Sequence, residues 1–294
     1  MLLAENKGLD PLDALRAIAI TDGIPKLVQL FDFQRPFAEN LGLLFTQNSA
    51  YFRYAESELR WHFRTPETYN ILLYGMATGH NRISQLAEFS GFPQNKCDKY
   101  LKALDKAGLL ETVQRKDITD HIRTHYYPKG GYWKTWFRYV FPSQGCCLKP
   151  LEWDSLQQLA NDIDRSIVAE YFKTVCWKWM KKNYGDYYWD EILGFDDPKQ
   201  QNVTVNGVHF DYVQETKDHT IYVKIWDDIG EGFPKAEFQR IEAATTAVRP
   251  FYENIYFLFS AGKACNYVEQ LRNLETVSVV NLKSLLGQKN KELF

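Results

Sequence analysis

The order of patterned segments in residues 151–294 constrains the fold more than any other feature of this sequence. Two alternating, strand-like segments are followed by a helical pattern, an apolar strand, a second helical pattern and a last strand: QNVTVNGVHFDYV, TIYVKIWD, PKAEFQRIEAATTAV, NIYFLFS, ACNYVEQLRNL and TVSVVNL. Strands that are followed by alternating helices and strands imply a mixed sheet with helices on both faces. The sequence therefore predicts an α/β (α+β) fold.

Asp211 and Lys224 lie on the two strand-like segments, at positions that suit metal-dependent cleavage of phosphodiesters. In such cleavage, carboxylates hold a divalent ion against the scissile phosphate, and a lysine positions or polarises the attacking water. Alternation along a strand places residues 222 and 224 on one face, so a Glu-x-Lys pair has the useful spacing. Position 222 holds Tyr222, however, and a neutral phenol is a poor ligand for Mg²⁺. Asp211 and Lys224 are therefore candidates for vestigial catalytic residues.

A relocated carboxylate would be needed to complete such a metal site. The candidates on neighbouring segments are Glu170, Glu191, Glu237 and Glu242. Three interpretations stay open: a degenerate nuclease-like domain, which the lost ligand favours, an active Mg²⁺- or Mn²⁺-dependent nuclease, and an unrelated hairpin. The first predicts no metal and no cofactor, and the second requires Mg²⁺ or Mn²⁺.

Residues 64–125 follow the plan of a winged helix. Helical patterns cover residues 66–77, 83–89 and 94–106, and the Gly91-Phe92-Pro93 turn separates the second from the third. Two short β-like runs, LLETVQRKD and HIRTHYYP, then surround a charged tip. A helix-turn-helix followed by a β-hairpin is typical of winged-helix domains.

The third helix of this segment concentrates basic charge. Lys99, Lys102 and Lys106 recur at three- and four-residue spacing and so share a helix face. Between Lys96 and Arg138 there are ten Lys or Arg residues against five Asp or Glu residues, in a chain whose net charge is -2. Lysine suits phosphate contacts, whereas base recognition usually employs Arg, Asn or Gln. We therefore predict that double-stranded DNA contacts the following residues, mostly through phosphates: Arg82, Gln94, Asn95, Lys96, Lys99, Lys102, Lys106, Arg115 and Lys116.

Other functional classes have weaker support. No apolar run approaches the roughly 18–20 residues that span a bilayer, and MLLAENKGLD lacks the features of a signal peptide, so we expect a cytoplasmic protein without a membrane partner. The five cysteines form no Cys-x-x-Cys pair and are expected to be reduced thiols rather than metal ligands. SAGKACN around Lys263 contains Gly-Lys but lacks the upstream Gly and the hydroxyl of a P-loop.

Four motifs occur in an order that is typical of one protein family. ALRAIAITDGIPKLVQLFD is similar to a Gly-Gly-x-Pro-x-Tyr-Leu lid motif, YNILLYGMATGHNRISQLAEFSGFPQNKCDKYLKALDKAGLLE to a winged helix, YYPKGGYWKTWFRYVFP to an aromatic connector, and VHFDYV with YVKIWD to Glu-Ile-Asp and Glu-Cys-Lys strands. Together they resemble the C-terminal part of archaeal and bacterial P-loop (AAA-type) ATPases that end in a DUF234-type domain. The resemblance implies a helical lid-like segment (1–63), a winged helix (64–125), an aromatic connector (126–150) and a degenerate restriction-endonuclease-like α/β domain (151–294).

Several positions depart from the family's pattern. Tyr222 stands in place of the strand Glu, Asp22 stands in place of the first lid Gly, and the connector Asp is replaced within residues 129–131. The sequence contains no segment similar to the family's ATPase domain, so we expect that this chain by itself neither binds nor hydrolyses ATP through that mechanism. The leading hypothesis is a non-catalytic DNA-binding or scaffold module. The alternatives are a metal-dependent nuclease, and a protein that associates with itself or docks on a separate P-loop ATPase through residues 1–63 and the connector.

Overall fold

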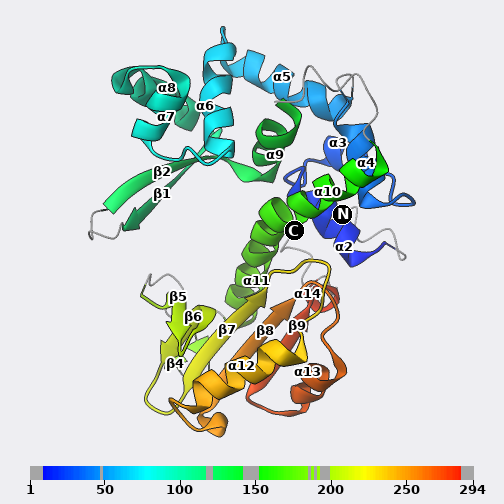
Figure 1. Ribbon diagram of the computed structural model, residues 1–294, viewed down its shortest axis with the longest axis vertical. Coiled ribbons are helices and arrows are strands. Elements are labelled where there is room, and N and C mark those ends of the chain that lie inside the picture. Colours follow the sequence, from blue (N-terminus) through cyan, green and yellow to red (C-terminus); the bar gives the residue numbers. More distant parts are fainter. Residues whose placement is uncertain are drawn as a thin grey trace. The chain divides into compact units, whose positions relative to one another are not determined.

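The computed structural model describes residues 9–46, 49–116, 122–141, 152–184, 187–188, 191–192 and 199–285, with the backbone alone at 115–116, 187–188 and 191–192. These residues divide into two compact units, one within residues 16–163 and the other within residues 1–15 and 164–294. Figure 1 shows their helices and strands, and the predicted mixed α/β fold is confirmed. Within the described ranges we find no helix whose length and apolar character would let it span a bilayer.

The unit within residues 16–163 contains a helix-turn-helix and a β-hairpin. Its helices are α6 (Glu67–Ala77), α7 (Ile83–Ser90) and α8 (Gln94–Lys106), and its antiparallel strands are β1 (Leu110–Lys116) and β2 (Ile122–Pro128). These bounds agree with the predicted helical and β-like segments of the winged helix. The hairpin is joined to the helices through Asn81, which exchanges hydrogen bonds with the backbone of Tyr126. The hairpin tip, residues 117–121, lies outside the described residues.

Further helices of this unit precede and follow the winged helix in the chain. They include α3 (Pro25–Val28), α4 (Phe37–Leu44), α5 (Ala50–His62) and α10 (Trp153–Ile163), while α2 (Pro11–Ala19) crosses the boundary between the units. α10 belongs to the first unit because it packs on α4, where Leu156 lies against Gly42. The segment predicted as a nuclease-like domain therefore starts with a helix that packs on α4, within residues 1–63.

The aromatic connector is helical in residues 130–140. It forms α9 (Gly130–Thr135) followed by the π-helical turn η1 (Trp136–Val140), whereas residues 126–128 belong to β2 and residues 142–150 lie outside the described residues. The Tyr132 hydroxyl donates to the carbonyl of Tyr51 at 2.8 Å, and the two rings meet edge to face with centroids 4.9 Å apart. Trp136 packs on Phe52 of α5 at 5.9 Å. The aromatic residues Tyr132, Trp133, Trp136 and Phe137 therefore belong to the core of this unit.

Asp22 binds the first turn of α9. Its carboxylate accepts hydrogen bonds from the backbone N–H groups of Gly131 at 2.6 Å and Tyr132 at 3.2 Å, which are donors that a helix N-terminus leaves unpaired. Gly130 has φ +80°, and a Cβ added there would lie 2.4 Å from an Asp22 oxygen. Asp22 and Gly130, which lie where the sequence departs from the lid and connector motifs, are thus in direct contact. Each residue is compatible with the other.

A five-stranded mixed sheet organises the second unit. The strands are β5 (Gln201–Val205), β6 (Val208–Glu215), β7 (Thr220–Trp226), β8 (Asn254–Ser260) and β9 (Val277–Asn281), which lie side by side in that order. β5, β6 and β7 pair antiparallel, whereas β7, β8 and β9 pair parallel. The shorter elements of this unit are η3 (Asp164–Val168), β3 (Tyr187–Tyr188), β4 (Glu191–Ile192), η4 (Phe251–Glu253), η5 (Leu271–Asn273) and α14 (Leu282–Leu285).

Helices cover both faces of this sheet (Figure 1). Tyr256 of β8 packs on Phe238 of α12 (Lys235–Thr246), in a core cluster that also includes α13 (Asn266–Gln270). The next residue, Phe257, points to the other face and packs on Tyr184 of α11 (Ala169–Tyr184). Every residue of β8 is buried, as expected for a strand covered on both sides. This burial explains the uninterrupted apolar run NIYFLFS.

The loops after β7 and β8 touch each other through their backbones. A Cβ added at Gly232 would lie 1.8 Å from the carbonyl oxygen of Lys263, and a Cβ at Gly262 would lie 2.7 Å from the carbonyl carbon of Glu231. Real Cβ atoms do not approach backbone atoms so closely. The two loops therefore require glycine at both positions.

We expect the Gly232→Ala variant to lose about 3 kcal/mol of unfolding free energy, because the new methyl group meets rigid backbone rather than a side chain that can turn away. Thermal unfolding of the full chain, followed by circular dichroism, should show a Tm about 6–12 °C lower. Gly230→Ala is the matched control, since the nearest atom to its Cβ is an Asp228 oxygen at 3.9 Å. Equal losses in both variants would contradict the close approach.

Candidate functional site

Asp211 and Lys224 meet where the backbone pairing of β6 and β7 ends. The antiparallel register runs from Glu215 opposite Thr220 to Tyr212 opposite Val223. Beyond that point side chains connect the strands: the Asp211 carboxylate accepts the backbone N–H of Ile225 at 2.7 Å, and the Lys224 ammonium donates to the carbonyl of His209 at 2.7 Å. Each side chain therefore satisfies a backbone group of the opposite strand.

The two side chains have ionic partners on opposite faces of the sheet. Asp211 lies 3.3 Å from the ammonium of Lys173 on α11, whereas Lys224 lies 3.7 Å from the carboxylate of Glu237 on α12. Glu237 also binds Arg240 at 2.9 Å. The side chains of Asp211 and Lys224 are only 6% and 13% exposed. A nuclease needs its carboxylate and its lysine to converge on one phosphate, and these contacts hold the two groups apart.

Lys173 lies between two carboxylates. Its ammonium is 3.3 Å from Asp211 and 3.7 Å from Asp227, which follows the end of β7. A lysine in this place supplies one of the two positive charges that a divalent ion would bring to paired carboxylates. Neither Lys173 nor Asp227 was predicted from the sequence. No local pattern indicates this contact, because the packing of α11 on the sheet brings the residues together.

Tyr222 is a core residue. It is 1% exposed, and its ring lies 4.9 Å from that of Phe210 and stacks on that of Tyr256 at 5.7 Å. Burial raises the pKa of the Tyr222 phenol, which keeps it neutral. The residue that replaces the expected Glu therefore contributes packing and offers no anionic ligand.

The relocated carboxylates considered from the sequence do not assemble a metal site among the residues that the structure describes. Glu237 is engaged by Lys224 and Arg240, and the side chain of Glu191 lies outside the described residues.

Cys176, which lies near Asp211, is not a metal ligand in its protonated form. Burial, followed by the charge of Asp211, raises the pKa of the Cys176 thiol, so that group stays protonated. In the described ranges no group of three or more His, Cys, Asp or Glu side chains is placed to hold a metal ion.

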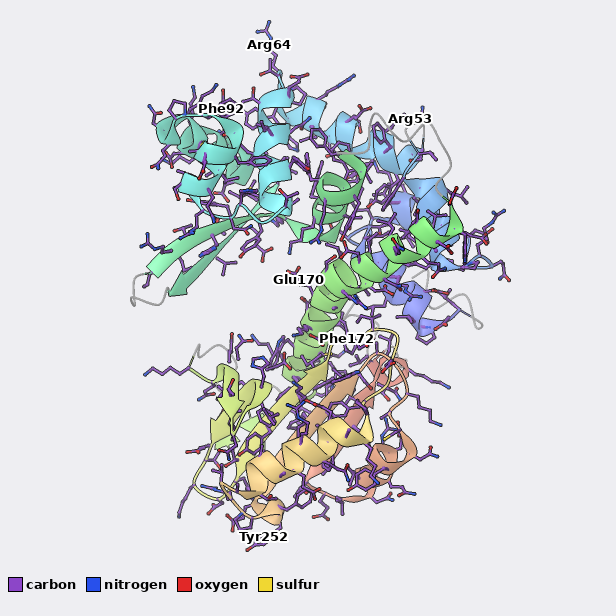
Figure 2. The ribbon with its side chains drawn as sticks, viewed as in Figure 1. Arg53, Arg64, Phe92, Glu170, Phe172 and Tyr252 are labelled. Carbon is purple, nitrogen blue, oxygen red and sulfur yellow. The ribbon has the colours of Figure 1, made fainter. Side chains whose placement is uncertain are left out.

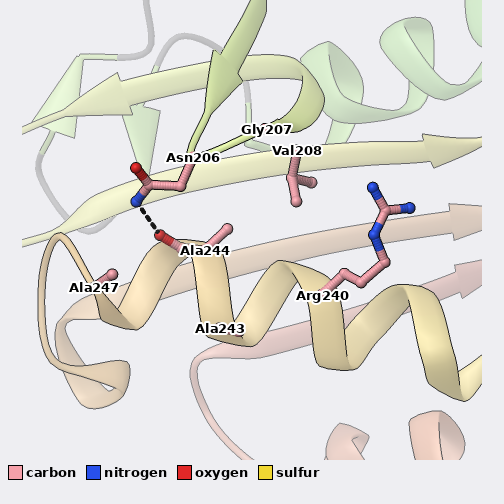
Figure 3. A pocket seen from close by; sticks show the side chains of 7 residues that line it. All are labelled: Asn206, Gly207, Val208, Arg240, Ala243, Ala244 and Ala247. Carbon is pink, nitrogen blue, oxygen red and sulfur yellow. Dashed lines mark hydrogen bonds between the residues drawn. The ribbon is translucent and has the colours of Figure 1, made fainter.

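A shallow pocket lies between the β5–β6 turn and α12 (Figure 3). Asn206 donates to the carbonyl of Ala244 at 2.8 Å, and small side chains form most of the lining. The charged group at this pocket is Arg240, which already binds Glu237. The pocket therefore lacks the convergent polar groups of a catalytic centre.

Asp211→Ala should lower the unfolding free energy by about 2–4 kcal/mol, because it leaves the Ile225 N–H without its acceptor and Lys173 without its buried partner. Asp227→Ala is the matched control, since it removes the same lysine's other partner at a side chain that is 64% exposed. We expect that control to change stability by about 0.5 kcal/mol. Urea unfolding measures both values, and a small loss in Asp211→Ala would show that its carboxylate is not structural.

α8 presents the predicted DNA-binding residues to solvent. Cys97, Leu101 and Leu104 point into the core, and the remaining faces of the helix carry exposed basic and amide side chains: Gln94, Asn95, Lys96, Lys99, Lys102 and Lys106. Arg82 is exposed just before α7. Arg115 and Lys116 lie in β1, but their side chains are outside the described residues.

The four lysines of α8 differ in their partners. Lys102 binds Asp98 at 2.7 Å, and Lys96 lies over the ring of Phe92 at 3.9 Å. Lys99 and Lys106 have no ion-pair partner among the described residues. These two lysines are therefore the most available cations of the helix.

Trp61 and its arginine neighbours form a further exposed group that was not predicted from the sequence. Trp61 is 84% exposed at the end of α5, and both Arg60 and Arg64 are exposed. Arg64 projects away from the ribbon in Figure 2. The sequence RWHFR shows that aromatic and basic residues lie together, but periodicity alone does not reveal which face of α5 is exposed.

Comparisons with known proteins give little functional information. The sequence matches no known protein family and no solved structure. It is similar to Uncharacterized protein MJECL04 of Methanocaldococcus jannaschii, with 26% identity over 126 residues, which are 42% of this chain and 28% of that protein. The chain therefore spans less than a third of this relative's length, and the relative's name states no activity.

Proposed function

We propose that this protein is a non-catalytic DNA-binding module whose winged helix contacts the phosphates of duplex DNA. The observation that carries the proposal is the exposed basic face of α8, on which Lys99 and Lys106 have no ion-pair partner among the described residues. Ammonium groups that are free of carboxylates can replace the counterions of a DNA backbone on binding. Winged helices place the corresponding helix in the major groove.

The residues around Lys99 and Lys106 suit a positioning role more than sequence recognition. Gln94 and Asn95 are exposed at the N-terminal end of α8, where amides can reach base edges, and Arg82 adds a cation before α7. No arginine lies on α8 itself. Most of the contact energy should therefore come from phosphates, and binding should depend strongly on salt.

The sheet-containing unit serves as a scaffold in this proposal. Its order of elements, α11, β5, β6, β7, α12 and β8, supports the suggestion that the chain corresponds to the C-terminal part of P-loop ATPases with a DUF234-type, restriction-endonuclease-like domain. Support for loss of catalysis comes from Lys173, whose ammonium forms ion pairs with both Asp211 and Asp227, and from the burial of Tyr222.

Removing the charges of Lys99 and Lys106 should weaken duplex binding and reduce its dependence on salt. The double variant Lys99→Gln/Lys106→Gln should lower the slope of log affinity against log salt by about 2, since each lost phosphate contact removes about 0.9. Lys102→Gln should have a smaller effect, because that lysine is already paired with Asp98. Fluorescence anisotropy of a labelled duplex at several salt concentrations measures these slopes.

The matched control for that titration is Lys178→Gln/Lys217→Gln, which makes the same charge change at exposed lysines of the other unit. We expect it to leave the slope unchanged. Equal slopes for the two double variants would mean that α8 is not the contact surface.

The proposal also predicts that the protein does not cleave DNA. Supercoiled plasmid incubated with the full chain and Mg²⁺ or Mn²⁺ should show no more nicking than plasmid with the metal alone. Asp211→Asn is the informative variant for the nuclease alternative, because an amide oxygen can still accept the Ile225 N–H while the ligand charge is lost. Metal-dependent nicking by the native chain that disappears in this variant would support a nuclease.

Docking of another protein is the second candidate function. Exposed apolar side chains within residues 1–63 favour it, with Trp61 at 84% and Leu43 at 52% exposure. If the chain binds no duplex at low salt, this apolar surface becomes the principal candidate for the functional surface. The resemblance predicts that its partner is a separate P-loop ATPase.

A further inference from the structure

A second cavity lies at the carboxyl ends of the parallel strands. β7, β8 and β9 run in the same direction, so their last residues, Trp226, Ser260 and Asn281, reach the same edge of the sheet (Figure 1). The cavity of about 490 Å³ at this edge is lined by the segments that follow all three strands and by the start of α2. In open sheets with parallel strands, ligands bind at this edge.

Basic side chains enter the cavity lining from three separate elements. Lys263 follows β8, Arg272 lies in η5 and Lys283 lies in α14. Arg272 is paired with Glu269 at 3.0 Å. Lys263 and Lys283 are exposed, and neither has an ion-pair partner among the described residues. Two uncompensated ammonium groups therefore border one cavity.

The acidic residues of the lining are already engaged. Glu269 binds Arg272, and the carboxylate of Asp10 accepts the backbone N–H of Leu12 at the start of α2 at 2.9 Å. Three basic side chains against these two carboxylates leave the lining with a net charge of +1. A ligand that carries a phosphate would provide the missing negative charge and several hydrogen-bond acceptors.

The two glycine-dependent loops give this edge a defined shape. Gly232 and Gly262 bring the backbones of the β7 and β8 loops into contact, and Lys263 follows Gly262 directly. Apolar side chains, Leu12, Ile229 and Leu282, complete the lining. A cavity of a few hundred Å³ with apolar walls and a few charged groups is typical of a small-molecule site.

We infer that the cavity between Lys263 and Lys283 binds a phosphate-bearing small molecule. The two ammonium groups hold the phosphate, and the apolar walls contact the group attached to it. This site lies in the other unit from the winged helix and does not involve Asp211 or Lys224. It is independent of DNA binding by α8.

Isothermal titration calorimetry of the full chain with AMP, and separately with pyrophosphate, tests this inference. Saturable binding of either compound is expected, and Lys263→Gln or Lys283→Gln should weaken it about tenfold each, as for the loss of one charged hydrogen-bond donor. Lys217→Gln, at an exposed lysine in the β6–β7 turn, is the control and should leave the affinity unchanged. Circular dichroism of each variant checks that its fold is retained.

Two further measurements distinguish a small molecule from the DNA backbone. The Lys99→Gln/Lys106→Gln variant should bind AMP or pyrophosphate as the native chain does, and a DNA duplex should not displace the bound compound. Displacement by the duplex would overturn the assignment to a small molecule. No saturation by either compound up to about 10 mM, or equal weakening by Lys217→Gln, would overturn the phosphate site itself.

Discussion

The burial of β8 on both faces is the constraint on which the second unit depends. Its alternate side chains pack on α11 and on α12, so neither face of the sheet is left for solvent at its centre. The same two helices then supply the ionic partners of Asp211 and Lys224 from opposite sides. The apolar strand β8 thus determines where the two helices lie. The helices in turn place Asp211 and Lys224, on neighbouring strands, in different surroundings.

Much of the local structure was predictable because it follows from periodicity and turn residues. The winged-helix segments have clear apolar spacing with a Gly-Phe-Pro turn, and NIYFLFS has the composition of a strand buried on both sides. The helical conformation of the connector was not predicted. The spacing of its aromatic side chains reflects their packing on α5, and a local sequence pattern does not reveal that packing. The sequence also left the role of Tyr222 open, and its stacking on Tyr256 identifies it as a core residue.

The candidate sites were predictable only in part. The lysines of α8 could be assigned to one helix face from their spacing alone, and the structure places them in solvent. Their spacing does not predict which of these lysines forms an ion pair, because that depends on whether a carboxylate such as Asp98 is in reach. Lys173 was beyond prediction for a similar reason: its contact with Asp211 requires the packing of a helix on a sheet. A local sequence pattern does not predict which charged residues the tertiary structure brings together.

The contact between Asp22 and Gly130 has a consequence for how such chains evolve. The carboxylate occupies the volume that any side chain at position 130 would need, and it also binds the helix that begins there. Neither position can change freely while the other stays as it is. A larger residue at 130 requires a smaller one at 22, and the helix must then find another acceptor for its first N–H groups. In an alignment of relatives these two positions should covary, although more than a hundred residues separate them. Chimeras that exchange the segment around Asp22 must exchange the connector with it.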